Sequence, residues 1–273
     1  ASPAYGEHWA QHWLDLARFA ETDGFEHDKV RPNAWRYRDW VIKALNNDLP
    51  YNRFVQLQIA GDQLRPDDPE GAIATGFLLA GQDMPDINLL SERRHMVLNE
   101  MTATVGSAFL GLTLGCAQYH EHKSDPISQK EFYQMRAFFE SDLQLKERKV
   151  GKITARVMQR SERIPTHVMI RGDFRRAGEV VQAAYPAVVN PAGARPAKGQ
   201  RRELATWLTE PDNALALRVA VNRLWLQHFG RPLAMPEDFG TQGLPPTHPQ
   251  LLDWLAAELP RRQWSLKAMH RLI

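Results

Sequence analysis

The sequence predicts a mainly α-helical protein, in which two helical modules are joined by a basic linker that contains proline, glycine and a short β-hairpin. Apolar residues recur at three- and four-residue spacing, helix boundary signals flank these stretches, and the composition changes after residue 143. A chain of 273 residues can bury a sizeable core. We place the N-terminal module at 1–143, the linker at 144–200 and the C-terminal module at 201–273.

The N-terminal module shows helical periodicity in successive stretches. In the first stretch Tyr5, Trp9 and Trp13 share one face, and the glycine at Asp23-Gly24 is expected to end that helix. Ser128 and Glu131 have the spacing of a capping box, which marks the start of the last helix. The expected helices span 5–20, 35–46, 51–60, 90–106 and 128–139, with a polar loop at 66–69.

The linker and the C-terminal module follow the same rules. Residues 146–163 are basic and compatible with a helix, whereas 166–171 alternate like a strand that Ala177-Gly178 could turn back into a hairpin ending near 182. Proline and glycine between 186 and 199 indicate an irregular stretch. The last expected helices span 201–208, 215–229, 249–259 and 265–273, and Gly230 ends the second of these.

Charge is distributed unevenly. The whole chain has a formal charge of only +2, but residues 144–202 hold 14 Lys/Arg against 4 Asp/Glu, a local net charge of +10. Such a stretch could contact an anionic polymer, either an anionic polysaccharide or, as the weaker alternative, nucleic acid. A solvated linker face explains the same composition without a partner.

Several classes of protein are disfavoured. Cys116 is the single cysteine, so no intrachain disulfide can form. The longest apolar runs are too short to span a membrane, and no basic-then-apolar signal peptide opens this sequence. It also has no Gly-x-Ser-x-Gly elbow and no glycine-rich phosphate loop, which disfavours serine hydrolases and nucleotide-dependent enzymes.

The main candidate site is the loop that holds His120, His122 and Asp125. In an extended loop, residues two apart point the same way, so two imidazoles and a carboxylate could converge on a divalent transition metal. The alternative is a structural loop whose polar groups bond the backbone and cap the helix at Ser128. Side chains that could complete a metal shell are His12, Asp15, Glu21, Asp23 and His95.

Three further groups carry weaker signals. His8 and His12 lie one helical turn apart with Asp15 close by, which suits a metal but equally a structural polar network. The acidic loop of Glu21, Asp23, Glu26 and Asp28 could supply paired carboxylates for glycoside hydrolysis, or it could be solvated. Arg223 could bind a carboxylate or sulfate, or could pair with Asp238 or Asp253.

Several longer strings occur together in one known family. They include Tyr5 to Arg18, Arg31 to Trp40, Cys116 to Pro126, Val221 to Trp225, Asp238 to Gly240, and Pro246 to Leu255. On these strings the chain resembles the planctomycete-type cytochrome-associated family, surface-associated and cytochrome c-like proteins that pair two domains of unknown function. Family members usually carry a long segment between the two modules that is mostly missing here, so the resemblance implies a shortened or fragmentary member.

The resemblance implies a haem site that this sequence cannot complete. The family usually shows Cys-x-x-Cys-His where this chain has Cys116-Ala-Gln-Tyr119-His120. Attachment of haem c needs two thiols, and a phenol forms no thioether, so only a vestigial site of Cys116 and His120 would remain. Covalent haem c is therefore not expected.

Three functions remain open from the sequence. The first is a periplasmic or extracellular protein with a histidine-centred metal or vestigial haem site, which the resemblance links to polysaccharide breakdown, as a metal-dependent hydrolase or an oxidoreductase. The second is a non-catalytic scaffold that binds glycans or another protein. The third is nucleic-acid binding through the basic linker.

Overall fold

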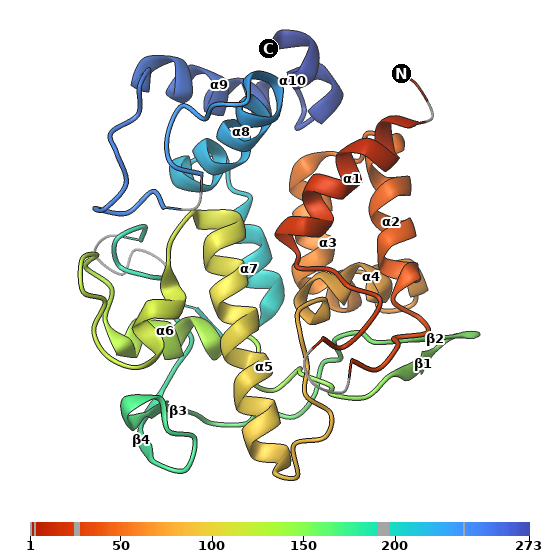
Figure 1. Cartoon of the computed structure of the whole chain (residues 1–273), viewed down its shortest axis with the longest axis vertical. Coiled ribbons are helices and arrows are strands. Elements are labelled where there is room, and N and C mark those ends of the chain that lie inside the picture. The colour runs from red at the N-terminus through yellow and green to blue at the C-terminus, as the bar shows by residue number, and fades with distance from the viewer. Residues whose placement is uncertain (1, 3, 25–27, 191–196, 237) are drawn as a thin grey trace.

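The computed structural model describes residues 2, 4–24, 28–190, 197–236 and 238–273. Helices dominate these ranges, and the strands form two small antiparallel hairpins, which confirms the mainly α fold class. In Figure 1 the long helix α5 (Leu90–Val105) runs down the middle of the molecule, and the first helices lie on one side of it. The last three helices, α8 (Ala214–Phe229), α9 (Pro249–Arg261) and α10 (Leu266–Leu272), gather at one end, close to both ends of the chain (Figure 1).

The N-terminal helices form where the apolar periodicity predicts them, with shifted ends. The first helix stops before Arg18, which adopts a left-handed backbone (φ 57°), and not near Gly24 as predicted. A helix at 69–74 occupies part of the expected polar loop, because the Asp68 side chain caps its first turn at Glu70 N. The capping box of Ser128 and Glu131 is confirmed. The helices are α1 (Ala4–Leu16), α2 (Trp35–Asn46), α3 (Tyr51–Leu64), α4 (Pro69–Ala74) and α6 (Gln129–Arg136), with shorter turns η1 (Thr75–Leu79), η2 (Gly106–Leu110, a π-helix) and η3 (Leu114–Gln118).

The linker contains one hairpin that was predicted and one that was not. Strands β3 (Thr166–Met169) and β4 (Ala177–Val181) form the predicted hairpin, with the short turn η4 (Ile170–Gly172) between them. The helix considered at 146–163 is wrong, because β1 (Arg148–Val150) pairs with β2 (Ile153–Ala155) there. Gly151, in a left-handed conformation, turns this second hairpin. Residues 191–196 of the expected irregular stretch lie outside the described residues.

The C-terminal helices agree closely with their predicted bounds. They are α7 (Arg201–Leu208), α8 (Ala214–Phe229), α9 (Pro249–Arg261) and α10 (Leu266–Leu272). Gly230 ends α8 in a left-handed conformation (φ 66°), as the sequence indicates.

One hydrophobic core runs through both predicted modules, from Ala10 in α1 to Met269 in α10. Its polar anchor is Arg201, which is fully buried and forms ion pairs with Asp62 (2.8 Å) and Asp142 (2.8 Å). The module boundaries at 143 and 200 stay a prediction, but the two regions pack as one body around this shared core. No helix in the described part of the chain combines the length and apolar character needed to cross a membrane.

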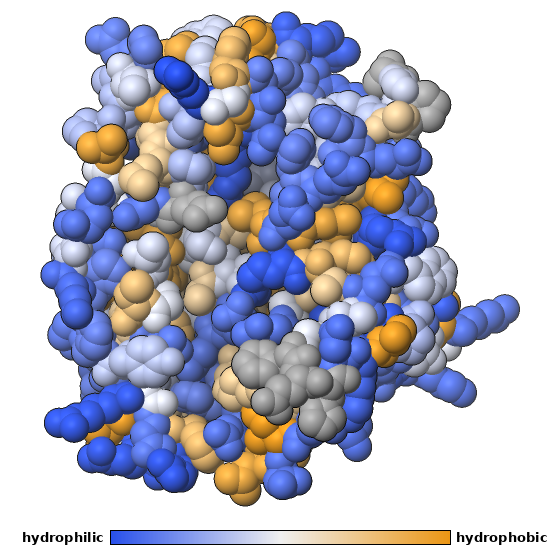
Figure 2. All heavy atoms as spheres, viewed as in Figure 1, coloured by the Kyte–Doolittle hydropathy of each residue, from blue (hydrophilic) through white to orange (hydrophobic). Residues whose placement is uncertain are grey.

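The face shown in Figure 2 carries hydrophobic residues as several small patches separated by hydrophilic ones. Isolated patches of this size are normal on a protein surface and indicate no docking site by themselves.

Candidate functional site

The predicted metal loop is held by hydrogen bonds that use both nitrogens of His122. The Nδ1 atom accepts the backbone N–H of Asp125 (2.8 Å) and that of Ser124 (3.3 Å), while Nε2 lies 3.0 Å from Thr113 Oγ1. A ring nitrogen that accepts a backbone N–H has no lone pair left for a metal. His122 therefore folds the loop back on itself in this arrangement.

Asp125 connects the N-terminal region to the C-terminal region. Its buried carboxylate accepts hydrogen bonds from the Thr241 backbone N (2.6 Å) and Oγ1 (2.9 Å), 116 residues away. Gly240 lies so close to this carboxylate that a Cβ atom there would overlap it. Beside this contact, Phe239 N donates to Gly111 O (2.7 Å). We use the name docking joint for the contact of Asp125 with Gly240 and Thr241, together with the neighbouring hydrogen bond between Phe239 and Gly111.

His120 does not join its two predicted partners. It is exposed, and its Nδ1 donates to Glu121 O (2.6 Å). Across the described ranges no three His, Cys, Asp or Glu side chains are placed to hold a metal ion together. A metal at His120, His122 and Asp125 would require these hydrogen bonds to break, so the metal centre stays a prediction.

The residues of the haem-like motif do not fit haem c. Cys116 is exposed on η3, and Tyr119 is 52% exposed and lies against Gly172. One thiol and one exposed imidazole can supply neither the second thioether nor a closed apolar pocket for the macrocycle.

The acidic candidates lie in a different part of the molecule. Asp23 pairs with Arg31 (2.6 Å), and Glu21 pairs with Arg38 (2.5 Å). Glu26 lies outside the described residues. Asp28 is the third described carboxylate, and it accepts a hydrogen bond from Gly24 N (2.9 Å). Arginine partners and a local backbone contact are both typical of a structural role.

The structure does bring together His12, Asp15 and Arg223. All three line a cavity of about 300 Å³ between α1, α3, α8 and α10, which we call the inter-module cleft. Its volume is in the lower range for small-ligand sites. Burial and the neighbouring His8 lower the pKa of His12, whereas Asp15 acts in the opposite direction. Other members of the wall are Tyr5, Trp9, Trp13, Tyr51, Gln227 and His270.

Arg223 fixes the position of α8 against the end of α5. Its guanidinium donates to the carbonyl oxygens of Ser107 (2.7 Å) and Ala108, both in the π-helix η2 that follows α5. The predicted partner Asp253 pairs with Arg218 (2.6 Å) instead. The geometry therefore shows Arg223 as an anchor of the cleft wall.

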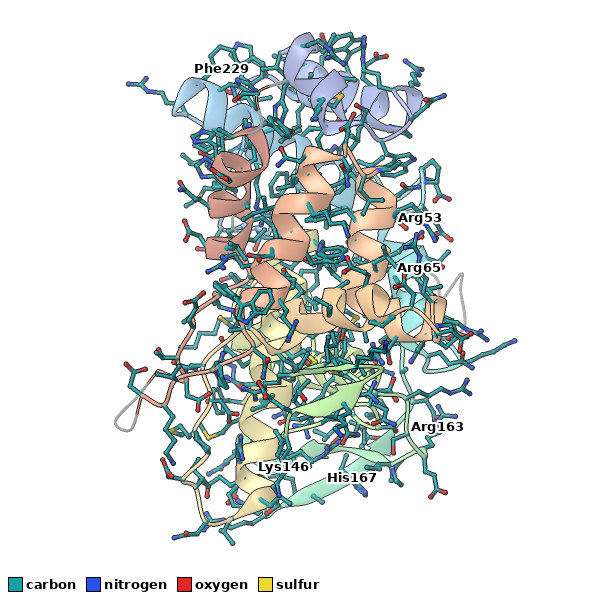
Figure 3. The ribbon with its side chains drawn as sticks, turned by 90° about the vertical axis from the view of Figure 1, so that its right-hand side faces the viewer. Arg53, Arg65, Lys146, Arg163, His167 and Phe229 are labelled. Carbon is teal, nitrogen blue, oxygen red and sulfur yellow. The ribbon has the colours of Figure 1, made fainter. Side chains whose placement is uncertain are left out.

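A continuous row of rings leads from the cleft to the surface. Trp9 stacks on His270 (4.1 Å between ring centroids) and lies 5.7 Å from His228, which in turn neighbours Phe229 (6.4 Å). Phe229 packs on Trp225 (4.2 Å) and is 53% exposed. We call these five residues the aromatic strip. Figure 3 shows Phe229 at one end of the molecule, on α8.

The two histidines of the strip were not identified from the sequence. His228 and His270 form a hydrogen bond (3.0 Å), and burial together with His228 lowers the pKa of His270 to about 4. His228 lies three residues after Trp225, which could have marked one aromatic helix face. That this face meets α1 depends on the packing of residues far apart in the sequence.

Comparison with known proteins identifies the chain at family level. Residues 1–143 match PSCyt2, described as a protein of unknown function (DUF1549), and residues 200–273 match PSD1, described as a protein of unknown function (DUF1553). No curated protein matches the chain, and no solved structure matches it. Since the first match spans more than half of the 273 residues, the chain belongs to the PSCyt2 (DUF1549) family, whose function is unknown, with a PSD1 (DUF1553) region at its C-terminal end.

Proposed function

We propose that this protein binds carbohydrate chains, without cleaving them, through the inter-module cleft and the aromatic strip. The observation that carries the proposal is the continuous row of rings from Trp9 to Phe229, which connects a cavity of about 300 Å³ to the surface. A polymer could place one sugar in the cleft and its neighbours along the strip.

The rings suit the apolar faces of sugar residues. A pyranose ring presents C–H groups on its faces and hydroxyl groups at its rim, so it packs well on indole and phenyl surfaces. Trp13 keeps a fixed orientation in the cleft wall, because its Nε1 donates to Gln58 Oε1 (2.7 Å) and to Tyr37 OH (3.2 Å). A wall fixed in this way binds a ligand at a lower entropic cost.

The polar groups of the cleft suit hydroxyl groups. Asp15 accepts hydrogen bonds, the exposed Gln227 both donates and accepts, and His12 is held toward its neutral form by burial. Among the described residues of the wall, Asp15 is the one carboxylate, whereas common glycosidase mechanisms use two. This supports binding over hydrolysis.

The proposal includes a polysaccharide as the polymer and a periplasmic or extracellular location for the protein, and the family resemblance supports both. The basic stretch 144–202 supports nucleic acid less well, because two of its arginines, Arg156 and Arg201, are held in ion pairs with aspartates. Lys146, Arg163 and His167 lie at the opposite end of the molecule from Phe229 (Figure 3).

The test is affinity electrophoresis of the full chain through gels that contain neutral, uronic or sulfated polysaccharides, followed by calorimetry on those that retard it. We expect Trp9→Ala and Gln227→Ala to weaken binding, Trp9→Ala by about tenfold, because a ring contact contributes on the order of 1 kcal/mol beyond its buried area. A Trp9→Phe variant, which keeps a ring, should bind with an intermediate affinity.

Trp254 on α9 is the matched control, since it is 46% exposed and does not line the cleft. Trp254→Ala should bind as the wild type does. The proposal fails if no polysaccharide retards the wild type, or if Trp254→Ala weakens binding as much as Trp9→Ala. Retardation by DNA with a steep salt dependence would favour the nucleic-acid alternative.

A further inference from the structure

A second cavity, of about 190 Å³, lies between α2, η1, the β1–β2 hairpin and the segment that precedes α2. It shares no lining residue with the inter-module cleft, so conclusions about it are independent of the proposed function. Its wall contains Arg31, Arg93 and Arg156 together with Asp23 and Asp83, which we call the arginine pocket.

The five charged side chains form one buried network. Asp83 accepts hydrogen bonds from Arg93 Nε (2.9 Å) and Nη2 (2.7 Å), and Arg156 Nη2 donates to the same carboxylate (2.5 Å). Arg31 Nε donates to Asp23 (2.6 Å), while its two terminal nitrogens donate to the carbonyls of Ala80 and Gly81. Each of these five side chains is at most 14% exposed.

The five side chains of the network carry a net charge of +1. Three guanidinium groups face two carboxylates, and burial lowers the pKa of Arg156 against the opposing effect of Asp83. The buried Nε–H of Arg156 finds no hydrogen-bond partner among the described residues. A buried cation without full compensation and a buried donor without an acceptor are both costly, and an anionic ligand would remove both costs.

The rest of the wall limits what this anion can be. Phe19, Ile73, Leu79 and Val157 give one side of the cavity an apolar surface. Arg36 adds a guanidinium whose Nε donates to Thr154 O (3.2 Å), and Glu147 adds a carboxylate. Over the described wall residues the excess is thus a single positive charge, which matches a monoanion better than a dianion.

We propose that the arginine pocket binds a ring-sized monocarboxylate, with its carboxylate on Arg156 and its ring against the apolar wall. The planar guanidinium suits a planar carboxylate, and a volume of about 190 Å³ admits one ring. A uronic acid residue and an aryl carboxylate share this chemistry, and the test separates them.

The experiment measures thermal shift and calorimetric binding of the full chain with glucuronate and with benzoate, each against its uncharged counterpart, glucose or benzamide. We expect one of the carboxylates to raise the melting temperature and its neutral counterpart to have no effect. The affinity should be on the order of millimolar, because the contact depends on one charge-assisted interaction and one ring. The carboxylate that binds with the higher affinity shows whether the pocket takes a uronic acid residue or an aryl carboxylate.

Arg156→Met should weaken binding by at least about tenfold, the effect of one charge-assisted hydrogen bond. If that variant does not fold, Arg156→Lys carries the test, because it keeps the charge and lacks the Nε–H. Arg38→Met is the matched control, since Arg38 is on the neighbouring α2 helix, 38% exposed, and outside the pocket. Equal affinity of wild type and Arg156 variants, equal stabilisation by inorganic sulfate, or no shift with either carboxylate would overturn the proposal.

Discussion

The docking joint predicts a strong energetic coupling between Asp125 and Gly240. Replacing Gly240 with alanine places a Cβ atom against the Asp125 carboxylate, which must then move away from Thr241. Replacing Asp125 with alanine removes the same two hydrogen bonds but leaves space for that Cβ atom. The two substitutions should therefore be far from additive, although 115 residues separate them in the sequence.

The magnitudes follow from the contacts. Asp125→Ala should cost about 2 kcal/mol, since hydrogen bonds to a charged acceptor contribute about 1.5–3 kcal/mol each and Thr241 is exposed enough for water to replace part of them. Gly240→Ala should also cost about 2 kcal/mol, through overpacking and the displaced carboxylate. Independent sites would lose about 4 kcal/mol in the double variant. We expect a loss of about 2–3 kcal/mol, hence a coupling of about 1–2 kcal/mol.

Urea unfolding of the wild type, both single variants and the double variant, followed by circular dichroism and tryptophan fluorescence, measures this coupling. Unfolding free energies that add within about 0.5 kcal/mol would refute the docking joint. Repeating the series with EDTA and with added Zn²⁺ separates the structural role from a metal role. A loss on Asp125→Ala that appears only in the presence of metal would support the metal centre instead.

Four further results are expected. The purified protein should show no Soret band, because Tyr119 removes one attachment thiol, and a haem that survives denaturation would contradict this. Elemental analysis should find no transition metal at unit stoichiometry, since both nitrogens of His122 are in hydrogen bonds. A bound metal that is lost when His120 and His122 are both replaced with alanine would reverse that conclusion. Arg201→Met should destabilise the fold by about 3–5 kcal/mol in thermal or urea unfolding, because it leaves two aspartates buried without their cation, whereas a loss below 1 kcal/mol would mean that water reaches them. Burial and a neighbouring arginine lower the pKa of His95 to about 4, below its unfolded value of about 6.5, so the stability should fall as the pH drops from 6.5 to 4. His95 contributes at most about 1.4 kcal/mol per pH unit to this loss, and His270, whose pKa is lowered in the same way, adds its own share. A His95→Gln variant that keeps the full slope in urea unfolding would contradict this assignment.

The geometry of the inter-module cleft bears on two functions that the sequence leaves open, a metal centre and a glycan-binding scaffold. His12 and Asp15 suggest a metal or polar network, and Arg223 suggests an anion clamp, when each is considered by itself. In the structure the arginine is engaged by backbone carbonyls, and the other two lie in a wall dominated by aromatic rings. The scaffold alternative, a glycan-binding protein, therefore explains more of this geometry than a metal centre does.

The sequence by itself determined the helical architecture. Helix periodicity and end signals are local properties, so α2 and α7 have the predicted bounds and Gly230 ends α8 as expected. The β1–β2 hairpin was missed because its basic residues show no clear alternation, and its formation depends on burying Ala155 and Val157 against Ala72 of α4.

Only the tertiary structure decided what the candidate residues do. The local sequence around Asp125 is equally compatible with a metal ligand and with an acceptor for Thr241. Its actual role depends on a partner that lies 116 residues away in the sequence. The aromatic strip and the arginine pocket arise in the same way, since α1 meets α8 and α10, and Arg156 of the linker meets Asp83, only after folding. A spacing pattern records neighbours along the chain, whereas the pairing of buried charges and rings depends on the packing of segments that no local pattern connects.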